Sequence, residues 1–375
     1  MRAPWSISFA LILLAGAGAS AQETRTVETQ AGRMSVETIA AGLENPWGLA
    51  FLPDGRMLVT EKPGRLRIVT RSGQVSNPVS NVPRVAARGQ GGLLDVAVSP
   101  DFARDRTVFL SYAEAGDGGT AGTALARGRL ASDGALDDVR VIFRQTPKVD
   151  GGQHFGSRIA FARDGAIFLT TGDRGKFDPA QDVSNTIGVI LRLNGDGSAV
   201  KDNPFAGRQG ARPEIFSYGH RNIQGAAIHP RTGALWVHEM GPRGGDEINV
   251  IAAGRNYGWP LVSWGSHYSG AAIAKPSTRP DLTDAIHQWT PSIAPSGMAF
   301  YEAGLIPKWR GSLLAGALAG RMLVRVTLDG EKVAGEERIP LNARIRDVKV
   351  GPDGAVYLLT DASKGSVLRL APAAP

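Results

Sequence analysis

Residues 48–60 read Gly-Leu-Ala-Phe-Leu-Pro-Asp-Gly-Arg-Met-Leu-Val-Thr, and this phrase decides the fold. It combines a short apolar alternation, a Pro-Asp-Gly turn and a second apolar run. Apolar residues in short runs bounded by turn formers predict two strands joined by a hairpin. The phrase returns five more times along the chain, at residues 94–112, 157–171, 225–238, 296–317 and 347–360.

Each copy is followed by further short apolar segments, such as residues 65–69, 189–193, 321–328 and 367–370, which gives about four strands per repeat. No long amphipathic helix pattern competes with them. Six such units predict an all-β fold, a six-bladed β-propeller with four-stranded antiparallel blades around a central channel. A sandwich or a pair of barrels does not explain the sixfold return of the turn phrase. We therefore expect one propeller domain over residues 22–375.

The first residues have the pattern of a secretory signal. Arg2 precedes an apolar run at residues 7–15, and the Ala-Ser-Ala tripeptide at 19–21 supplies small residues for cleavage. The run is far shorter than the ~20 residues needed to cross a bilayer, and no later segment is long and apolar enough to do so. We predict a signal peptide over residues 1–21 and a periplasmic or secreted protein with no membrane span.

The composition excludes several classes of function. The chain contains no cysteine, so it has no disulfide, thiolate nucleophile, iron–sulfur cluster or covalently attached c-type haem. Its formal net charge of +7 would suit an anionic partner. We expect no nucleic-acid partner, because export makes one improbable and because the basic residues are scattered rather than massed in a run.

Polar residues gather just before the first strand of each predicted blade. In a propeller those strands line the central channel, so the residues that precede them converge on one rim. Five repeats contribute such residues, which are Gln90, His154, Arg221, Asn222, Gln224, Ser292, Arg344 and Arg346. The three arginines would repel one another unless an anion fills the space between them. The sequence therefore predicts a small polyanionic ligand at the channel mouth.

His154 is the only histidine in that set, and imidazole is well suited to accept a proton near neutral pH. Asp173 ends the second strand of the same repeat, where it could orient the ring and stabilise its protonated form. A structural histidine and a turn aspartate are the alternative interpretation of this pair.

A glycine-rich segment at residues 239–249 combines carboxylates with exposed backbone carbonyls. That composition suits calcium, which takes six to eight oxygen ligands from carboxylates, carbonyls and water. A long loop with solvated acids fits the composition equally well.

These segments resemble the soluble aldose sugar dehydrogenases that depend on pyrroloquinoline quinone (PQQ), in the glucose/sorbosone dehydrogenase family. The resemblance runs from about Val36 to Pro372, nearly the whole predicted mature chain. Its most specific pieces are residues 89–94, 154–158, 218–222, 241–249 together with 256–260, and 344–347.

The resemblance implies a quinoprotein that oxidises aldose sugars at C1 to the lactone. His154 would be the general base, Asp173 would assist it, and Arg221 would stabilise negative charge on the quinone oxygen. The cofactor contacts that the resemblance implies are Gln90, Arg221, Asn222, Tyr268, Ser292, Arg344 and Arg346. Since the chain has no cysteine for haem attachment, electrons would leave to an external acceptor.

The resemblance also implies calcium. The backbone carbonyls of Gly241 and Pro242 would bind the Ca²⁺ that polarises the cofactor, and Glu247 and Tyr257 would belong to a nearby structural calcium site.

The chain departs from the family at two positions. Ala319 stands where some members place a lysine that contacts the cofactor, and Arg321 is the candidate substitute. Gln153 stands where glucose-oxidising members have an acid, so we expect a broad range of aldoses. Two other functions stay open: a calcium-dependent, lactonase-like hydrolase, whose rim should carry acids and asparagines, and a non-catalytic ligand-binding propeller.

Overall fold

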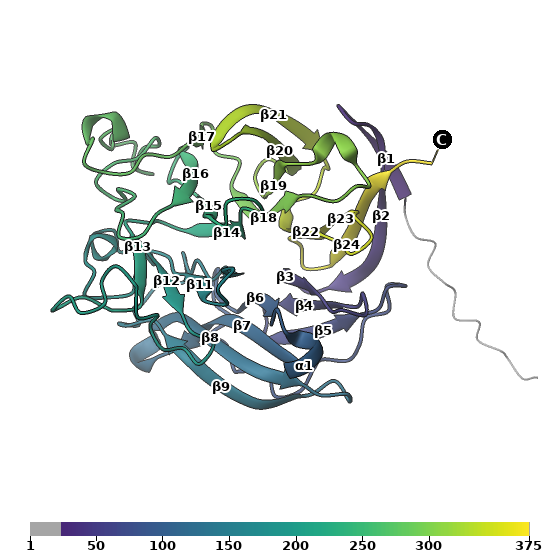
Figure 1. Cartoon of the computed structure of the whole chain (residues 1–375), viewed down its shortest axis with the longest axis horizontal. Helices are drawn as coiled ribbons and strands as arrows, with labels where there is room; N and C mark the ends of the chain where they lie inside the picture. Colours follow the sequence, from purple (N-terminus) through teal and green to yellow (C-terminus); the bar gives the residue numbers. More distant parts are fainter. Residues whose placement is uncertain (1–23, 375) are drawn as a thin grey trace, which may run out of the picture.

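Six antiparallel sheets stand in a ring around a central axis (Figure 1) in the computed structural model, which describes residues 24–374. The predicted six-bladed β-propeller is confirmed. The described residues hold one short α-helix, α1 (Phe102–Asp105), apart from brief 3₁₀ turns. None of their helices combines the length and apolarity needed to span a membrane. The predicted signal peptide, residues 1–21, lies outside the described residues.

The first three blades follow the chain in order. Their strands are β3 (Pro46–Phe51), β4 (Met57–Glu61) and β5 (Arg65–Val69); then β6 (Leu93–Val98), β7 (Thr107–Ala115), β8 (Ala121–Leu130) and β9 (Leu136–Arg144); then β10 (Ile159–Phe161), β11 (Ile167–Thr170), β12 (Val189–Leu193) and β13 (Ile215–Tyr218).

The last three blades complete the ring. Their strands are β14 (Ile223–Ile228), β15 (Leu235–Glu239), β16 (Asp246–Ile251) and β17 (His287–Trp289); then β18 (Pro295–Tyr301), β19 (Ser312–Ala317), β20 (Met322–Asp329) and β21 (Lys332–Pro340); then β22 (Ile345–Val350), β23 (Val356–Thr360) and β24 (Gly365–Pro372), joined by β2 (Gly32–Leu43) and β1 (Thr24–Thr29).

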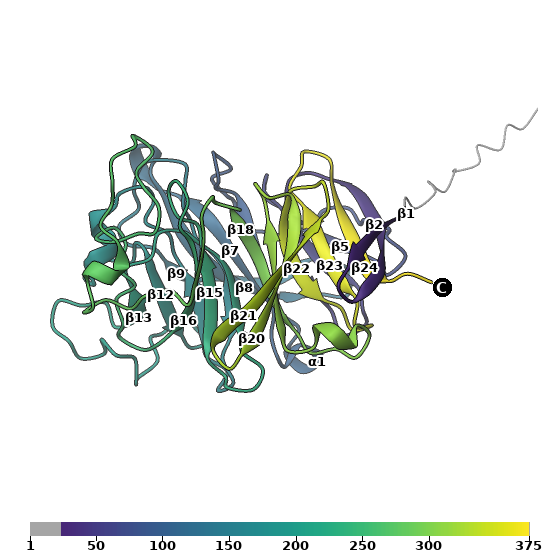
Figure 2. The same cartoon turned by 90° about the horizontal axis from the view of Figure 1, so that it is seen from above.

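Two blades depart from the expected four strands. The first has three, because the segment after β5 follows it only irregularly: Ser76 uses its side-chain hydroxyl to accept the Ile68 N–H, and Pro78 has no N–H to donate. The sixth has five, because β2 pairs antiparallel with β24 from Met34↔Pro372 to Leu43↔Gly365. Figure 2 shows β1, β2 and β24 side by side, so both ends of the described chain close the ring in one blade.

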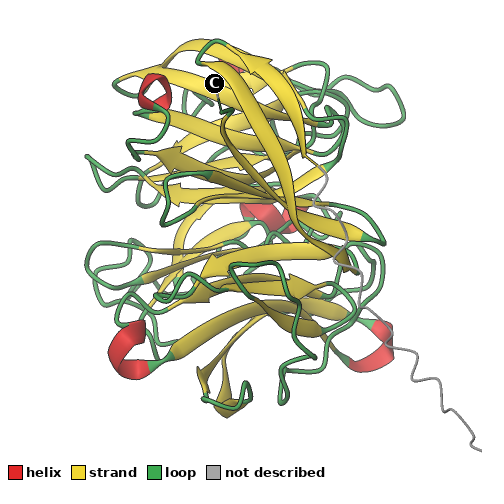
Figure 3. Ribbon diagram, turned by 90° about the vertical axis from the view of Figure 1, so that its right-hand side faces the viewer, coloured by secondary structure: helices red, strands yellow, loops and turns green. Residues whose placement is uncertain are grey.

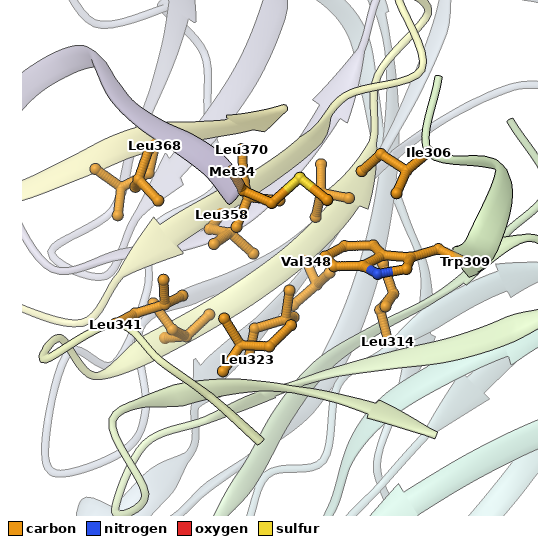
Figure 4. Packing of buried hydrophobic residues seen from close by; sticks show 14 of the residues in the cluster. Met34, Ile306, Trp309, Leu314, Leu323, Leu341, Val348, Leu358, Leu368 and Leu370 are labelled. Atoms are coloured by element: carbon orange, nitrogen blue, oxygen red, sulfur yellow. The ribbon is translucent and has the colours of Figure 1, made fainter. Parts of the chain in front are cut away.

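The hydrophobic core lies between neighbouring blades. Between the fifth and sixth blades, Trp309 and Leu323 pack against Val348 and Leu358, and Met34 of β2 joins them (Figure 4). Each such side chain contributes roughly 1.5–3 kcal/mol when it is fully buried. The apolar alternation therefore stabilises blade-to-blade contact as well as each sheet.

The inner strands β3, β6, β10, β14, β18 and β22 contact one another in succession, and β22 contacts β3. Loops gather along both edges of the sheets (Figure 3). The residues that precede the inner strands therefore meet at one end of the channel, as predicted.

Candidate active site

A cavity of about 360 Å³ lies at the end of the channel where the loops before the inner strands meet, and its volume is typical of a small-molecule site. Its polar lining residues come from several blades and are Asn45, Lys62, Gln90, Asn222, Gln224, Arg344, Arg346 and Asp361. Its larger apolar lining residues are Trp47, Leu94, Phe155, Met240 and Leu318. Five predicted rim residues therefore share one hollow: Gln90, Asn222, Gln224, Arg344 and Arg346.

His154 stands beside this cavity. Its backbone N–H donates to Oε1 of Gln90 over 2.8 Å, and the next residue, Phe155, lines the cavity. Its backbone is left-handed, with φ 54°, and lies against the end of β11. A Cβ on Gly172 would lie 2.0 Å from the His154 carbonyl oxygen, so only glycine permits this approach.

Asp173 holds the His154 ring. Nδ1 of His154 lies 2.7 Å from Oδ1 of Asp173, and Trp259 donates its indole N–H to Oδ2 over 2.7 Å. The backbone N–H of Asp173 donates to the Arg221 carbonyl, which fixes the aspartate between the third and fourth blades. Because a carboxylate only accepts hydrogen bonds, Nδ1 carries the proton and Nε2 keeps a free lone pair. The pair can therefore act as an oriented base.

Arg221 is buried and precedes Asn222, the residue that leads into the inner strand β14. Its Nη1 donates to the carbonyls of Met240 and Gly241, each over 2.9 Å, and its guanidinium lies 5.3 Å from the Trp259 ring centroid. Its Nε has no hydrogen-bond partner within the described part of the chain. A buried charge with an unused donor is suited to receive an anionic group.

Arg344 and Arg346 share one counter-ion that the sequence did not reveal. Nη2 of each arginine approaches Oδ2 of Asp361, at 2.9 and 3.2 Å. Burial alone would raise the pKa of Asp361, but the two guanidinium groups outweigh burial and lower that pKa. This single carboxylate aligns both arginines at the cavity wall and neutralises only one of their two charges.

Arg158 forms a buried ion-pair cluster next to the cavity-lining residues Trp47 and Arg346. Its Nη1 lies 2.9 Å from Oδ1 of Asp347 and 3.3 Å from Oδ1 of Asp95, and all three side chains are buried. Its Nη2 donates to the Arg346 carbonyl, and its guanidinium lies 4.1 Å from the Trp47 ring centroid. Its Nε donates to the Gln224 carbonyl of β14, so one side chain joins the first, second, fourth and sixth blades to its own.

Three predicted cofactor contacts do not line the cavity: Arg221, which lines a separate small hollow, Tyr268 and Ser292. Tyr268 is 72% exposed, and its hydroxyl lies 3.4 Å from Nη2 of Arg221. The Ser292 hydroxyl donates to Oδ2 of Asp246 over 2.7 Å. Tyr268 thus stands at the open side of Arg221, whereas Ser292 fixes the aspartate of the glycine-rich segment.

The structure turns Arg321 away from the cavity. Its guanidinium donates to the carbonyl of Asn342, and neither Arg321 nor Ala319 lines the hollow. Lys62, from the turn after β4, lines it instead.

The glycine-rich segment folds back on itself between β15 and β16. A Cβ on Gly241 would lie 2.3 Å from the carbonyl oxygens of Gly244 and Gly245, so these carbonyls gather around one point. The Gly241 N–H donates to Asp246, and its carbonyl accepts from Arg221. Grouped carbonyl oxygens are the ligand type that calcium prefers.

A second group of oxygens lies behind Arg221. Glu239, Glu247 and Tyr257 line a small hollow together with the Gly241 backbone. Burial and the nearby charge of Glu239 raise the pKa of Glu247 well above its usual value. Oδ1 of Asn249 has no partner among the described atoms. A hard cation bound here would stabilise the charged form of Glu247 and would give Oδ1 of Asn249 a partner. Residues 24–374 hold no cluster of three metal-ligating side chains, so the further ligands would be backbone oxygens or water.

Four contributors to the site carried no distinct signal in the sequence: Trp47, Lys62, Trp259 and Asp361. Trp259 belongs to the segment 256–260 that supports the family resemblance, but nothing in its spacing links it to Asp173. Lys62 and Asp361 follow the second strands of their blades, so counting back from the first strands missed them.

Known proteins with related sequence and structure agree on one family. The protein-family model for Glucose / Sorbosone dehydrogenase matches residues 43–369 of this chain. The chain is 46% identical over 345 residues to aldose sugar dehydrogenase YliI of Escherichia coli (strain K12), which covers 90% of this chain and 93% of that protein.

Solved structures give the same result. The soluble aldose sugar dehydrogenase of Escherichia coli in the apo form superposes with a TM-score of 0.88 at 45% identity, covering 91% of this chain and all (100%) of that one. The PQQ-bound form of aldose sugar dehydrogenase from Streptomyces coelicolor superposes with a TM-score of 0.75 at 30% identity, covering 90% and 98%.

Proposed function

The chain belongs to the glucose/sorbosone dehydrogenase family, and from this membership we propose that it is a quinoprotein that oxidises aldose sugars at C1 to the lactone. The observation that carries the proposal is the His154–Asp173 pair, with its 2.7 Å contact, at the edge of a cavity lined by arginines. A base and an anion-binding cup are the two parts that this reaction requires.

The cavity fits PQQ by charge and by hydrogen-bonding chemistry. PQQ carries three carboxylates, and Arg344 and Arg346 retain one net positive charge after pairing with Asp361. Gln90 and Asn222 add amide groups to the wall, and Trp47 and Phe155 add flat apolar surface. We propose that Gln90, Asn222, Arg344 and Arg346 hold the cofactor, which supplies the hydride-accepting centre when bound. Tyr268 and Ser292 remain weaker candidates.

His154 has the proton-transfer role in this proposal. Nε2 accepts the proton of the sugar's anomeric hydroxyl as the C1 hydride leaves, so the substrate loses two electrons and two hydrogens and becomes the lactone. Asp173 keeps the acceptor nitrogen turned outward and stabilises the imidazolium that forms.

Arg221 has an electrostatic role, because its buried guanidinium and unused Nε would stabilise negative charge that develops beside it. The carbonyls of Gly241 and Pro242 would hold a Ca²⁺ at the cofactor, and Glu247 and Tyr257 would hold a second one. Electrons would then pass to an external acceptor, and the signal peptide at residues 1–21 would deliver the enzyme to the periplasm or beyond.

The hydrolase alternative receives no support from the cavity wall. A calcium-activated lactonase needs acids free to hold the metal. The only carboxylate that lines this cavity within the described residues, Asp361, is already paired with Arg344 and Arg346.

Reconstitution tests the proposal. Apo-protein mixed with PQQ and Ca²⁺ is expected to reduce an artificial dye when glucose or another aldose is added, and to be inactive without PQQ. His154→Ala should still bind PQQ but lose turnover, whereas His287→Ala, on the outer strand β17, should retain it. Lack of sugar oxidation by the reconstituted wild type, or lactone hydrolysis without PQQ, would refute the proposal.

A further inference from the structure

Among the described residues, Lys62 is the one cation on the cavity wall that forms no ion pair with a carboxylate. Arg344 and Arg346 pair with Asp361, whereas no ion pair among residues 24–374 includes Lys62. Its Nζ donates to the Gly89 carbonyl over 2.8 Å. An ammonium group carries three donors, so two remain for a ligand.

The backbone holds Lys62 at this position. Its N–H donates to the Asn45 carbonyl, and its carbonyl accepts from the N–H of Leu93, which begins the inner strand of the next blade. A Cβ on Gly92 would lie 2.2 Å from that carbonyl oxygen, so the two chains touch. Lys62 therefore enters the cavity from a fixed junction between the first and second blades.

The surroundings disfavour an uncompensated charge there. Burial lowers the pKa of Lys62, and the nearby charge of Arg346 lowers it further, against a smaller opposing effect of Asp361. A partly buried cation without an anionic partner is costly, and an anionic ligand removes that cost. The lysine is thus arranged for a group that bears negative charge.

We propose that Lys62 is a cofactor-binding residue that pairs with a carboxylate of the quinone from the first blade, whereas the contact expected near Ala319 would come from the fifth. The proposal rests on the proposed function, since it assumes PQQ as the ligand. It goes beyond the sequence motifs, which place the cationic contacts on the fourth and sixth blades and the candidate Arg321 on the fifth.

A purely structural role is the competing explanation, because the hydrogen bond to Gly89 steadies the loop that carries Gln90. Two substitutions separate the explanations. Lys62→Gln keeps a donor for the Gly89 carbonyl and removes the charge, whereas Lys62→Arg keeps the charge. Lys332→Gln, at the exposed start of β21, is the matched control for loss of one positive charge.

The test is binding of PQQ to the apo-protein with Ca²⁺ present, measured by calorimetry over a series of salt concentrations. We expect Lys62→Gln to bind PQQ roughly ten- to a hundredfold more weakly, the usual effect of losing one charged hydrogen bond, and to show a weaker salt dependence. Lys62→Arg should stay within a few-fold of the wild type, and Lys332→Gln should be unchanged. Unfolding temperatures should agree among all four proteins, which excludes a folding defect.

The outcomes separate this inference from the proposed function. If the wild type binds no PQQ, both fail. If the wild type binds PQQ and Lys62→Gln binds it with equal affinity and equal salt dependence, only the role of Lys62 is overturned. If Lys62→Arg is as weak as Lys62→Gln, positive charge is not what matters and the proposal is likewise overturned.

Discussion

The indole N–H of Trp259 donates to Oδ2 of Asp173 over 2.7 Å, on the oxygen that His154 does not use. With both carboxylate oxygens engaged, the aspartate cannot rotate, and the imidazole it holds keeps one orientation. Trp259 also lies under the Arg221 guanidinium, so one ring supports two residues of the candidate site.

Trp259→Phe should therefore slow turnover without weakening the binding of the cofactor. The substitution keeps most of the aromatic surface but removes the donor to Asp173, so His154 loses part of its orientation. We expect kcat to fall roughly tenfold, the lower end of the usual effect of losing one charged hydrogen bond, with the Kd for PQQ within a few-fold of the wild type. Equal kcat values in steady-state dye reduction would show that the contact with Trp259 is unimportant.

Asp173→Asn should lower kcat more than Trp259→Phe does. An amide can present its N–H₂ to Nδ1 of His154, which favours the tautomer whose proton sits on Nε2 and leaves no base for the sugar hydroxyl. We expect kcat to fall by about 10²–10⁴, the usual contribution of a positioned general base. Binding of PQQ by the variant is the control, because a variant that loses both binding and turnover would point to a collapsed site instead.

The fold could be predicted because its signal repeats. Six copies of one turn phrase gave the six blades and the inner strand of each. The ring closure could not be predicted in the same way: β1 and β2 contain no turn phrase, and their place beside β24 follows from a pairing between residues more than 300 positions apart. Local patterns carry no information about that partner.

The candidate site was predictable in part for a related reason. Gln90, Asn222 and Arg344 precede inner strands and Arg346 lies at the start of one, so the propeller geometry alone brings them together. Asp361 and Lys62 follow second strands, where side-chain direction decides whether a residue faces the channel or the solvent. Such directions depend on tertiary packing, which a single sequence does not display.

Glu336 should give the stability of the protein a defined dependence on pH. Burial raises its pKa, but hydrogen bonds from His287, Arg338 and Trp289 outweigh burial and lower the pKa from 4.5 to about 2. A carboxyl with a lowered pKa stabilises the folded state above its unfolded value and loses that effect as the pH falls. Its contribution should therefore be complete above pH 4.5 and disappear as the pH falls to about 2.

Glu336→Gln tests this linkage. At pH 7 we expect a loss of about 1–3 kcal/mol, because the glutamate joins the outer strand of the fourth blade to that of the fifth through charged hydrogen bonds. The difference in unfolding free energy between variant and wild type should narrow steadily below pH 4.5. A difference that stays constant down to pH 2.5 would contradict the shifted pKa.

Calcium removal tests the proposed structural site at Glu247. If Ca²⁺ binds the folded protein there, it stabilises the protein by about 2.7 kcal/mol at a hundredfold excess over Kd, and a chelator should lower the unfolding temperature. Glu247→Gln should abolish the response to the chelator, whereas Glu331→Gln, on the exposed turn before β21, should retain it. A chelator response that survives in Glu247→Gln would place the stabilising ion elsewhere.

Arg158 is expected to be the most sensitive residue on the propeller axis. It forms ion pairs with two buried carboxylates, Asp95 and Asp347, and replacing it with methionine removes the nearest cation from both, leaving the more distant Lys349, whose Nζ lies 3.9 Å from Oδ2 of Asp347. Removing one partner of a buried ion pair commonly costs about 3–5 kcal/mol, so Arg158→Met should lower the unfolding temperature by several degrees. Because the same guanidinium donates to the Arg346 carbonyl, PQQ affinity should fall as well.

The pH dependence of Arg158→Met distinguishes this ion-pair role from a packing defect. Burial already raises the pKa of Asp95 in the presence of Arg158, and removing the arginine raises that pKa further. A carboxyl with a raised folded-state pKa favours the folded state only at low pH, and its effect turns against folding as the pH rises above 3.8. The gap in stability between variant and wild type should therefore be smallest near pH 4 and widen towards pH 7. Arg158→Met combined with Asp95→Asn should recover part of the loss at pH 7, since one of the two buried negative charges is gone. A gap that is constant from pH 4 to pH 7 and no recovery in the double variant would mean that Arg158 acts through its volume and not through its charge.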